Sequence, residues 1–138
     1  MSIRKISHIG IAVRDLEQQM HLYRDVLQLE LVNEEVVQDQ KVRVAMFRIG
    51  ESTIELLCPT AADSPVAKFL DRRGEGIHHI AYEVSDLEAD LQRLAGEGVE
   101  LIDLSPRPGA HGKSIAFLHP RATFGVLTEL CKPRRPGP

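Results

Sequence analysis

The sequence predicts an α+β domain built from two copies of one unit, because two stretches near its beginning recur later in the chain. Residues 8–17 match residues 79–88 at six of ten positions when they are shifted by 71. Residues 54–56 recur with a shift of 74 as residues 128–130, and both triplets contain Glu-Leu. Each copy therefore begins with a histidine and ends with a glutamate.

The first copy has the pattern of a strand, a helix and three further strands. Alternation along the first strand puts His8, Gly10 and Ala12 on one face, where the small neighbours leave space for a ligand. Asp15 is a suitable helix cap, and four apolar residues follow it at helical spacing: Leu16, Met20, Tyr23 and Leu27. We expect a strand over residues 6–13, a helix over residues 16–27, and strands over residues 29–37, 42–49 and 53–58.

The second copy repeats this βαβββ order. Asp86 is the expected cap of its helix, and residues 106–113 (PRPGAHGK) are too rich in glycine and proline for a core and are expected to form a loop. Between the copies, Ser64 followed by Pro65 predicts a connecting helix over residues 65–72. The strands expected in this copy are residues 77–84, 99–104, 114–118 and 125–131.

These elements are expected to form one domain. A half of roughly 60 residues would bury only about 60 % of its surface and be marginal by itself, so the halves should pack together. The expected boundaries are a first module at 5–58, a linker with the short helix at 59–76, a second module at 77–132 and a disordered tail at 133–138.

Composition indicates an ordinary soluble protein, with 43 % apolar and 27 % charged residues in a chain of 138. A net charge of −3 argues against a nucleic-acid partner. No apolar run approaches the roughly 20 residues of a membrane span, and the N-terminus has no signal sequence, so we expect no membrane association and a cytoplasmic location. Cys58 and Cys131 are expected to be reduced thiols.

The two adjacent histidines of the second copy must point to opposite faces of their strand, and the repeat chooses between them. His79 matches His8, so His79 is the functional candidate and His78 faces the other side. If the copies pair about a twofold axis, four side chains converge on one cavity: His8, Glu55, His79 and Glu129. Two imidazoles and two carboxylates suit Zn, Co, Mn, Ni or Fe and leave two octahedral positions open.

An ordinary structural role is the alternative for each of these residues. A single histidine on a strand is usually a packed, partly buried side chain. A carboxylate inside an apolar strand is harder to explain in this way, because burying it without a compensating partner is costly. The equivalent positions of the four residues in a duplicated unit therefore favour a metal site.

Five parts of the chain contain distinctive short segments: residues 8–13 (HIGIAV), 54–57 (IELL), 74–81 (GEGIHHIA), 109–113 (GAHGK) with 117–120 (FLHP), and 125–130 (GVLTEL). These segments resemble those of the methylmalonyl-CoA epimerases of the vicinal-oxygen-chelate (glyoxalase/bleomycin-resistance/dioxygenase) superfamily. The resemblance runs from about Ile6 to Leu130 and is most specific in the GEGIHHIA and GAHGK…FLHP segments.

The resemblance implies paired βαβββ modules that form one cupped mixed sheet, a homodimer and an acyl-CoA substrate. It also implies a divalent metal at the positions of His8, Glu55, His79 and Glu129, with Co²⁺ expected first and Zn²⁺, Mn²⁺ or Ni²⁺ as alternatives. Such enzymes serve propionate metabolism by interconverting (R)- and (S)-methylmalonyl-CoA through an enolate that a metal can stabilise.

Within this family, Glu129 is expected to act as acid and base as well as ligand. Some members carry a second glutamate at the position that is Val44 here, and valine cannot exchange a proton. The sequence leaves five candidates open for the second proton transfer: Glu34, Glu35, Lys41, His111 or an ordered water. His111 has the best position among them, although an ordinary exposed loop histidine is its alternative role.

Three other functions use the same superfamily frame. An extradiol dioxygenase needs open positions on Fe(II) that Glu55 would crowd, and a glyoxalase-type lyase is disfavoured by the GEGIHHIA segment. A non-enzymatic binding module would lack the metal residues. The cations that either hold CoA phosphates or serve only as solubility charges are Lys68, Arg72, Arg73, Arg107, Lys113 and Arg121.

Overall fold

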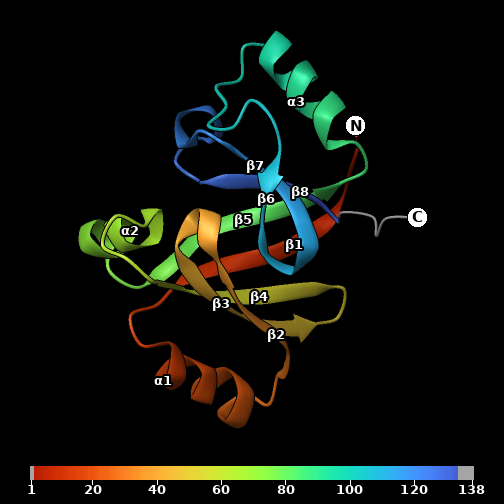
Figure 1. Ribbon diagram of the computed structural model, residues 1–138. Coiled ribbons are helices and arrows are strands. Elements are labelled where there is room, and N and C mark those ends of the chain that lie inside the picture. Colours follow the sequence, from red (N-terminus) through yellow and green to blue (C-terminus); the bar gives the residue numbers. More distant parts are fainter. Residues whose placement is uncertain (1, 134–138) are drawn as a thin grey trace. The chain divides into compact units, whose positions relative to one another are not determined.

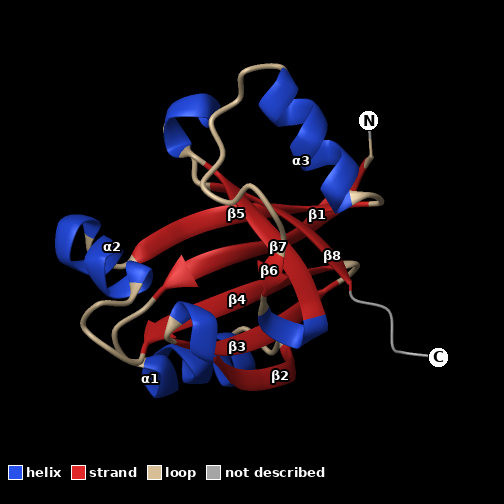
Figure 2. Ribbon diagram, turned by 45° about the horizontal axis from the view of Figure 1, so that its top comes forward, coloured by secondary structure: helices blue, strands red, loops and turns tan. Residues whose placement is uncertain are grey.

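The computed structural model describes residues 2–133 and contains two compact units (Figure 1). One unit is His8–His78, and the other joins the N-terminal segment, up to Ser7, to the chain from His79 onward. The expected tail at 133–138 lies outside the described residues, apart from Pro133, which ends a strand. Each unit is a mixed sheet with helical packing on one face, as the α+β prediction requires (Figure 2).

The unit His8–His78 contains a sheet in the order β2-β3-β4-β1. Its strands are β1 (Ile3–Ala12), β2 (Glu30–Val37), β3 (Val42–Ile49) and β4 (Ser52–Pro59). β1 is parallel to β4, whereas β2, β3 and β4 are antiparallel to one another. The predicted strands are thus confirmed, and their order brings the beginning and the end of the module side by side.

The first helix differs from its prediction. Asp15 caps α1 (Leu16–Met20) through a hydrogen bond from the Gln18 backbone amide, as expected, but the α-helix then passes into a π-helical segment, η1 (His21–Val26). The Leu27 amide donates to the carbonyl of Leu22, five residues earlier. This wider winding turns Leu27 away from the apolar stripe and leaves it 54 % exposed.

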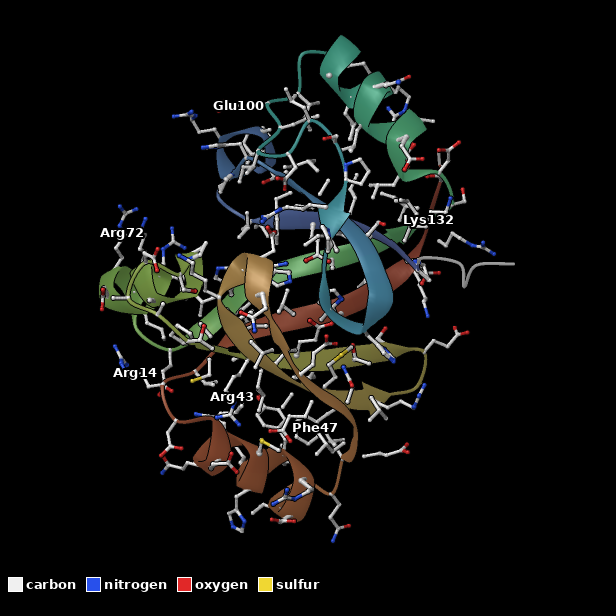
Figure 3. The ribbon with its side chains drawn as sticks, in the orientation of Figure 1. Arg14, Arg43, Phe47, Arg72, Glu100 and Lys132 are labelled. Carbon is white, nitrogen blue, oxygen red and sulfur yellow. The ribbon has the colours of Figure 1, made fainter. Side chains whose placement is uncertain are left out.

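The core of this unit lies between α1 and one face of the sheet. Its buried members are Val13, Leu16, Met20, Ala45, Phe47 and Leu56. Figure 3 shows Phe47 and Arg43 on the α1 side of β3. Because side chains alternate along a strand, the residues between these core positions face the opposite side, and Glu55 is one of them.

The connecting helix α2 (Pro65–Arg73) begins at a buried cap. Ser64 is fully buried; its Oγ accepts a hydrogen bond from the Val66 amide at 3.2 Å and donates one to the Gln40 carbonyl at 3.3 Å. The Ser-Pro pattern therefore predicted this helix to within one residue.

Replacing Ser64 with alanine is expected to lower the free energy of unfolding by about 1–2 kcal/mol, because the helix loses its cap and the partly buried Gln40 carbonyl loses a donor. Urea denaturation of the variant measures this loss. Ser105→Ala, at an exposed position, is the control, with an expected change of at most about 0.5 kcal/mol. Equal losses in both variants would contradict the capping role.

The second unit repeats the arrangement of the first. Its sheet has the order β5-β8-β7-β6, with strands β5 (Gly76–Val84), β6 (Arg107–Pro108), β7 (Lys113–Leu118) and β8 (Thr128–Pro133). β5 is parallel to β8, and α3 (Leu87–Gly96) packs on one face of the sheet. Leu87 and Leu91 of this helix form a buried cluster with Val84, Ala116, Leu118 and Leu130. Gly10 lies opposite Glu55 in one unit and Ala81 opposite Glu129 in the other, so the sequence repeat is also a repeat of strand register.

Two strand predictions in this unit are wrong. Residues 99–104 form no strand, and Leu101 makes only a single bridge to Leu118. The strand that pairs with β7 on this side is the two-residue β6, which lies inside the predicted loop. The prolines on either side of Arg107 remove donors that a longer ladder would need. The last strand begins at Thr128 rather than at residue 125, because Phe124 and Gly125 have positive φ angles of 58° and 98° that no strand accommodates.

Both cysteines are free thiols, as predicted. Cys131 is fully buried, while Cys58 is half-buried and its Sγ donates to the Arg14 carbonyl. Burial raises the pKa of the Cys58 thiol, which keeps it in the unreactive protonated form at neutral pH. Within residues 2–133, none of the helices has both the length and the apolar character of a membrane span.

Candidate metal centre

His8 and Glu55 form a buried pair in the unit His8–His78. β1 and β4 run parallel with Gly10 opposite Glu55, so His8, two residues before Gly10, lies on the same face of the sheet. His8 Nδ1 is 3.2 Å from Glu55 Oε2, and the two residues are only 3 % and 4 % exposed. The face that carries them is the one opposite the α1 core.

His79 and Glu129 form the equivalent pair in the other unit. His79 Nε2 is 3.3 Å from Glu129 Oε1, and these residues are 4 % and 3 % exposed. The His79 ring meets Phe117 edge-on, with a centroid distance of 5.5 Å, and Phe117 lies opposite Glu129 in the β7–β8 ladder. The aromatic contact and the carboxylate together restrict the orientation of the His79 ring.

The four residues predicted from the repeat are therefore two equivalent pairs, each made of one imidazole and one carboxylate. Both pairs lie on the sheet face away from the helix of their own unit. Burying a carboxylate costs several kcal/mol unless a partner compensates it, and a neighbouring imidazole or a cation does so. Nitrogen and oxygen donors of this kind suit a divalent transition metal or zinc, so the residues present fit such an ion.

The neighbouring His78 has a different environment, as the repeat register predicted. It is half-buried and packs edge-on against Phe69 of α2, at a centroid distance of 5.0 Å and an interplanar angle of 73°. A ring that packs on a helix in this way has a structural role.

Three further histidines lie outside the two His–Glu pairs. His119 caps the 3-10 helix Pro120–Thr123 by accepting the Arg121 amide hydrogen at Nδ1. His21 is exposed and lies 2.9 Å from Asp25; hydrogen bonds from Arg24 and His21 lower the pKa of Asp25 to about 2. His111 is exposed in the loop after β6, with a left-handed φ of 56°.

One arrangement beside the second pair was not predicted from the sequence. The guanidinium of Arg107 lies 5.6 Å from the centroid of the Phe117 ring, and Phe117 is the residue that also contacts His79. Arg107 Nε is 3.1 Å from Asp103 Oδ1. The sequence does not distinguish Arg107 from the five other candidate cations. The short β6–β7 pairing, with Arg107 opposite Ile115, brings it next to this pair. A two-residue strand next to prolines has no periodicity that would have indicated this.

Comparison with known proteins identifies the superfamily of this chain. The family model of the Glyoxalase/Bleomycin resistance protein/Dioxygenase superfamily matches residues 7–117, so the chain belongs to this superfamily. A Bacillus subtilis relative, the uncharacterized protein YqjC, is 47% identical over 132 residues that cover 96% of this chain and 94% of the relative. An ethylmalonyl-CoA/methylmalonyl-CoA epimerase from Cereibacter sphaeroides is 40% identical, with 93% of this chain and 97% of that protein covered.

A solved structure of an epimerase is also similar to this chain. A Streptomyces coelicolor methylmalonyl-CoA epimerase variant, in complex with 2-nitronate-propionyl-CoA, matches with a TM-score of 0.93 at 41% identity, covering 97% of this chain and 100% of that one. Within the superfamily, the chain belongs to the methylmalonyl-CoA epimerase family. The fold class and the family resemblance expected from the sequence motifs are both confirmed.

Proposed function

We propose that the protein is a methylmalonyl-CoA epimerase, an isomerase that interconverts the (R) and (S) forms of its acyl-CoA substrate. The observation that supports this most strongly is the pair of equivalent, buried His–Glu sites in a chain whose relatives include epimerases over nearly its full length. The bound acyl-CoA analogue in the Streptomyces coelicolor structure supports the substrate class.

We further propose that His8, Glu55, His79 and Glu129 jointly hold one divalent cation, with Co²⁺ as the first choice and Zn²⁺, Mn²⁺ or Ni²⁺ as alternatives. A cation held there supplies a Lewis acid that stabilises negative charge on the substrate oxygens. The repeat supports a cation shared by the two modules, because each module contributes the same two donor types from the same strand positions. In this proposal the modules at 5–58 and 77–132 act as one functional domain.

Glu129 is the proposed acid–base group on one side of the substrate. The α-hydrogen of methylmalonyl-CoA lies between a thioester and a carboxylate, so its removal leaves charge spread over both carbonyl groups. Glu129 as carboxylate removes the hydrogen, and Glu129 as carboxylic acid returns it. His79, 3.3 Å away, and the edge-on Phe117 ring keep this carboxylate in place and away from bulk water.

The quaternary and cellular parts of the proposal rest on the family resemblance and the composition. We propose a homodimer that acts in the cytoplasm, in propionate metabolism, without a nucleic-acid or membrane partner. The net charge of −3 supports the absence of a nucleic-acid partner.

Incubation with each pure epimer of methylmalonyl-CoA in D₂O tests the proposed activity. The protein with added Co²⁺ is expected to convert either epimer to the mixture and to introduce deuterium at the α-carbon, as NMR and mass spectrometry would show. Treatment with a chelator should remove this activity, and Co²⁺ should restore it. Deuterium uptake no faster than in a protein-free control would reject the epimerase function, and turnover of a glutathione hemithioacetal instead would favour a glyoxalase-type lyase.

A further inference from the structure

A β-bulge in β2 decides which of its acidic residues face the metal-binding side of the sheet. In the β2–β3 ladder, Leu31 pairs with Phe47, but Asn33 already pairs with Met46. Between these two pairs β2 advances by two residues and β3 by only one, so Val32 is the extra residue of the bulge. Such a bulge reverses the faces of the residues that follow it.

The bulge separates the neighbouring acids Glu34 and Glu35. Glu34 pairs across the ladder with Ala45, a member of the α1 core, and its Oε1 is 3.2 Å from the Arg43 guanidinium. Arg43 also approaches Glu17 of α1 at 3.4 Å, and Figure 3 shows Arg43 on the α1 side. Glu34 is thus on the helix side and is exposed.

Glu35 faces the other way. It lies opposite Val44, and Val44 lies opposite Leu57 of β4, two residues beyond Glu55 on the same face. Asn33, next along this face, lies opposite Met46, which in turn lies opposite Glu55. Glu35 therefore shares the sheet face of the His8–Glu55 pair.

A neighbouring amide holds the Glu35 carboxylate in position. Asn33 Nδ2 donates to Glu35 Oε1 at 2.7 Å and also lies 3.5 Å from Met46 Sδ. Glu35 is half-buried, whereas Glu34 is exposed. A fixed, partly desolvated carboxylate on this face is suited to proton transfer.

The sheet geometry sets the distance between Glu35 and Glu55. With strands about 4.8 Å apart and residues about 3.4 Å apart along a strand, the Cα atoms of Glu35 and Glu55 are separated by roughly 10 Å across the sheet and roughly 7 Å along it. Val44 and Met46 of β3 are the residues of this face that lie between the two glutamates. Lys41, by comparison, is ion-paired with Asp63 at the surface and has no such placement.

We propose that Glu35 is the second acid–base residue of the reaction, the one that inversion at the α-carbon requires in addition to Glu129. This inference rests on the proposed epimerase function. When the Glu129 carboxylate removes the α-hydrogen, the Glu35 carboxylic acid donates its proton to the other side of the α-carbon, which leaves Glu129 protonated and Glu35 ionised. The reverse reaction exchanges these roles, and proton exchange with water resets both groups.

Glu35→Gln tests this assignment, with Glu34→Gln as the matched control on the other face. Glutamine keeps the size of the side chain and can still accept from Asn33, so folding should be preserved. Interconversion by Glu35→Gln is expected to fall about 10²–10⁴-fold, the usual range for loss of a general acid–base group. Glu34→Gln is expected to stay within about twofold of wild type, because exposed substitutions away from the site have small effects.

Deuterium exchange from each pure epimer separates a catalytic role from a structural one. Glu35→Gln should exchange the α-hydrogen of one epimer without inversion, through Glu129, while the other epimer remains unexchanged. Co²⁺ affinity and melting temperature should match those of wild type. Equal slowing of both epimers together with weaker Co²⁺ binding would overturn the inference in favour of a structural role.

The outcomes for the two proposals are distinguishable. If wild-type protein interconverts the epimers and Glu35→Gln is as active as Glu34→Gln, only the role of Glu35 is rejected. If wild-type protein causes no exchange of either epimer, the epimerase function and the role of Glu35 are both rejected.

Discussion

Replacing Glu129 with glutamine is expected to slow epimerisation by about 10²–10⁴-fold or more. Glutamine has the same size as glutamate but cannot accept the α-hydrogen, so the proton transfer on one side of the substrate is lost. The same change removes an anionic oxygen 3.3 Å from His79 and weakens the proposed metal site. Rates of interconversion measured from each epimer, at saturating Co²⁺, give the size of the effect.

Glu88→Gln is the control for this substitution. Glu88 lies in the first turn of α3 and is exposed, so losing its charge should change the rate by less than about twofold. A Glu129→Gln protein that keeps full activity would show that Glu129 transfers no proton, even if metal binding were unchanged.

The second large effect is expected from His79→Ala, which should weaken metal binding by more than about 100-fold. Loss of a residue that only supports a ligand costs 10–100-fold in affinity, and loss of a ligand should cost at least as much. Equilibrium dialysis against Co²⁺, with metal analysis of the protein, measures the affinity. His79→Gln, which fills more of the space, shows whether the loss arises from the missing imidazole or from the cavity.

His78→Ala is the matched control, because His78 is the adjacent histidine on the same strand. It packs against Phe69 and faces the other side, so its loss should lower stability and leave Co²⁺ affinity within about twofold of wild type. If His78→Ala lost the metal and His79→Ala kept it, the register inferred from the repeat would be wrong.

Much of the fold and of the candidate site could be predicted because duplication makes distant positions comparable. A single histidine such as His8 carries little information, but its match to His79 selects one of two adjacent histidines and one strand face. The glutamates follow in the same way, since the β1–β4 and β5–β8 registers are equivalent. Regular strands and capped helices could be predicted for a second reason, namely their strong periodicity and clear cap residues.

The features that could not be predicted are those without periodicity. β6 has two residues next to prolines, so no pattern identifies it, while the apolar residues of 99–104 imitate a strand that does not form. The π-helical winding after Met20 adds a residue to a turn without any sequence signal. The bulge at Val32 is of the same kind, and for that reason the sequence did not distinguish Glu34 from Glu35.

The bulge in β2 has a consequence for how homologous chains are compared. Because one extra residue determines which of two neighbouring acids shares the sheet face of the His8–Glu55 pair, gaining or losing a single codon there would exchange their faces without any change of amino-acid type. A column-by-column comparison would record two retained glutamates and overlook the change. Chain length in this strand is therefore as informative about chemistry as residue identity.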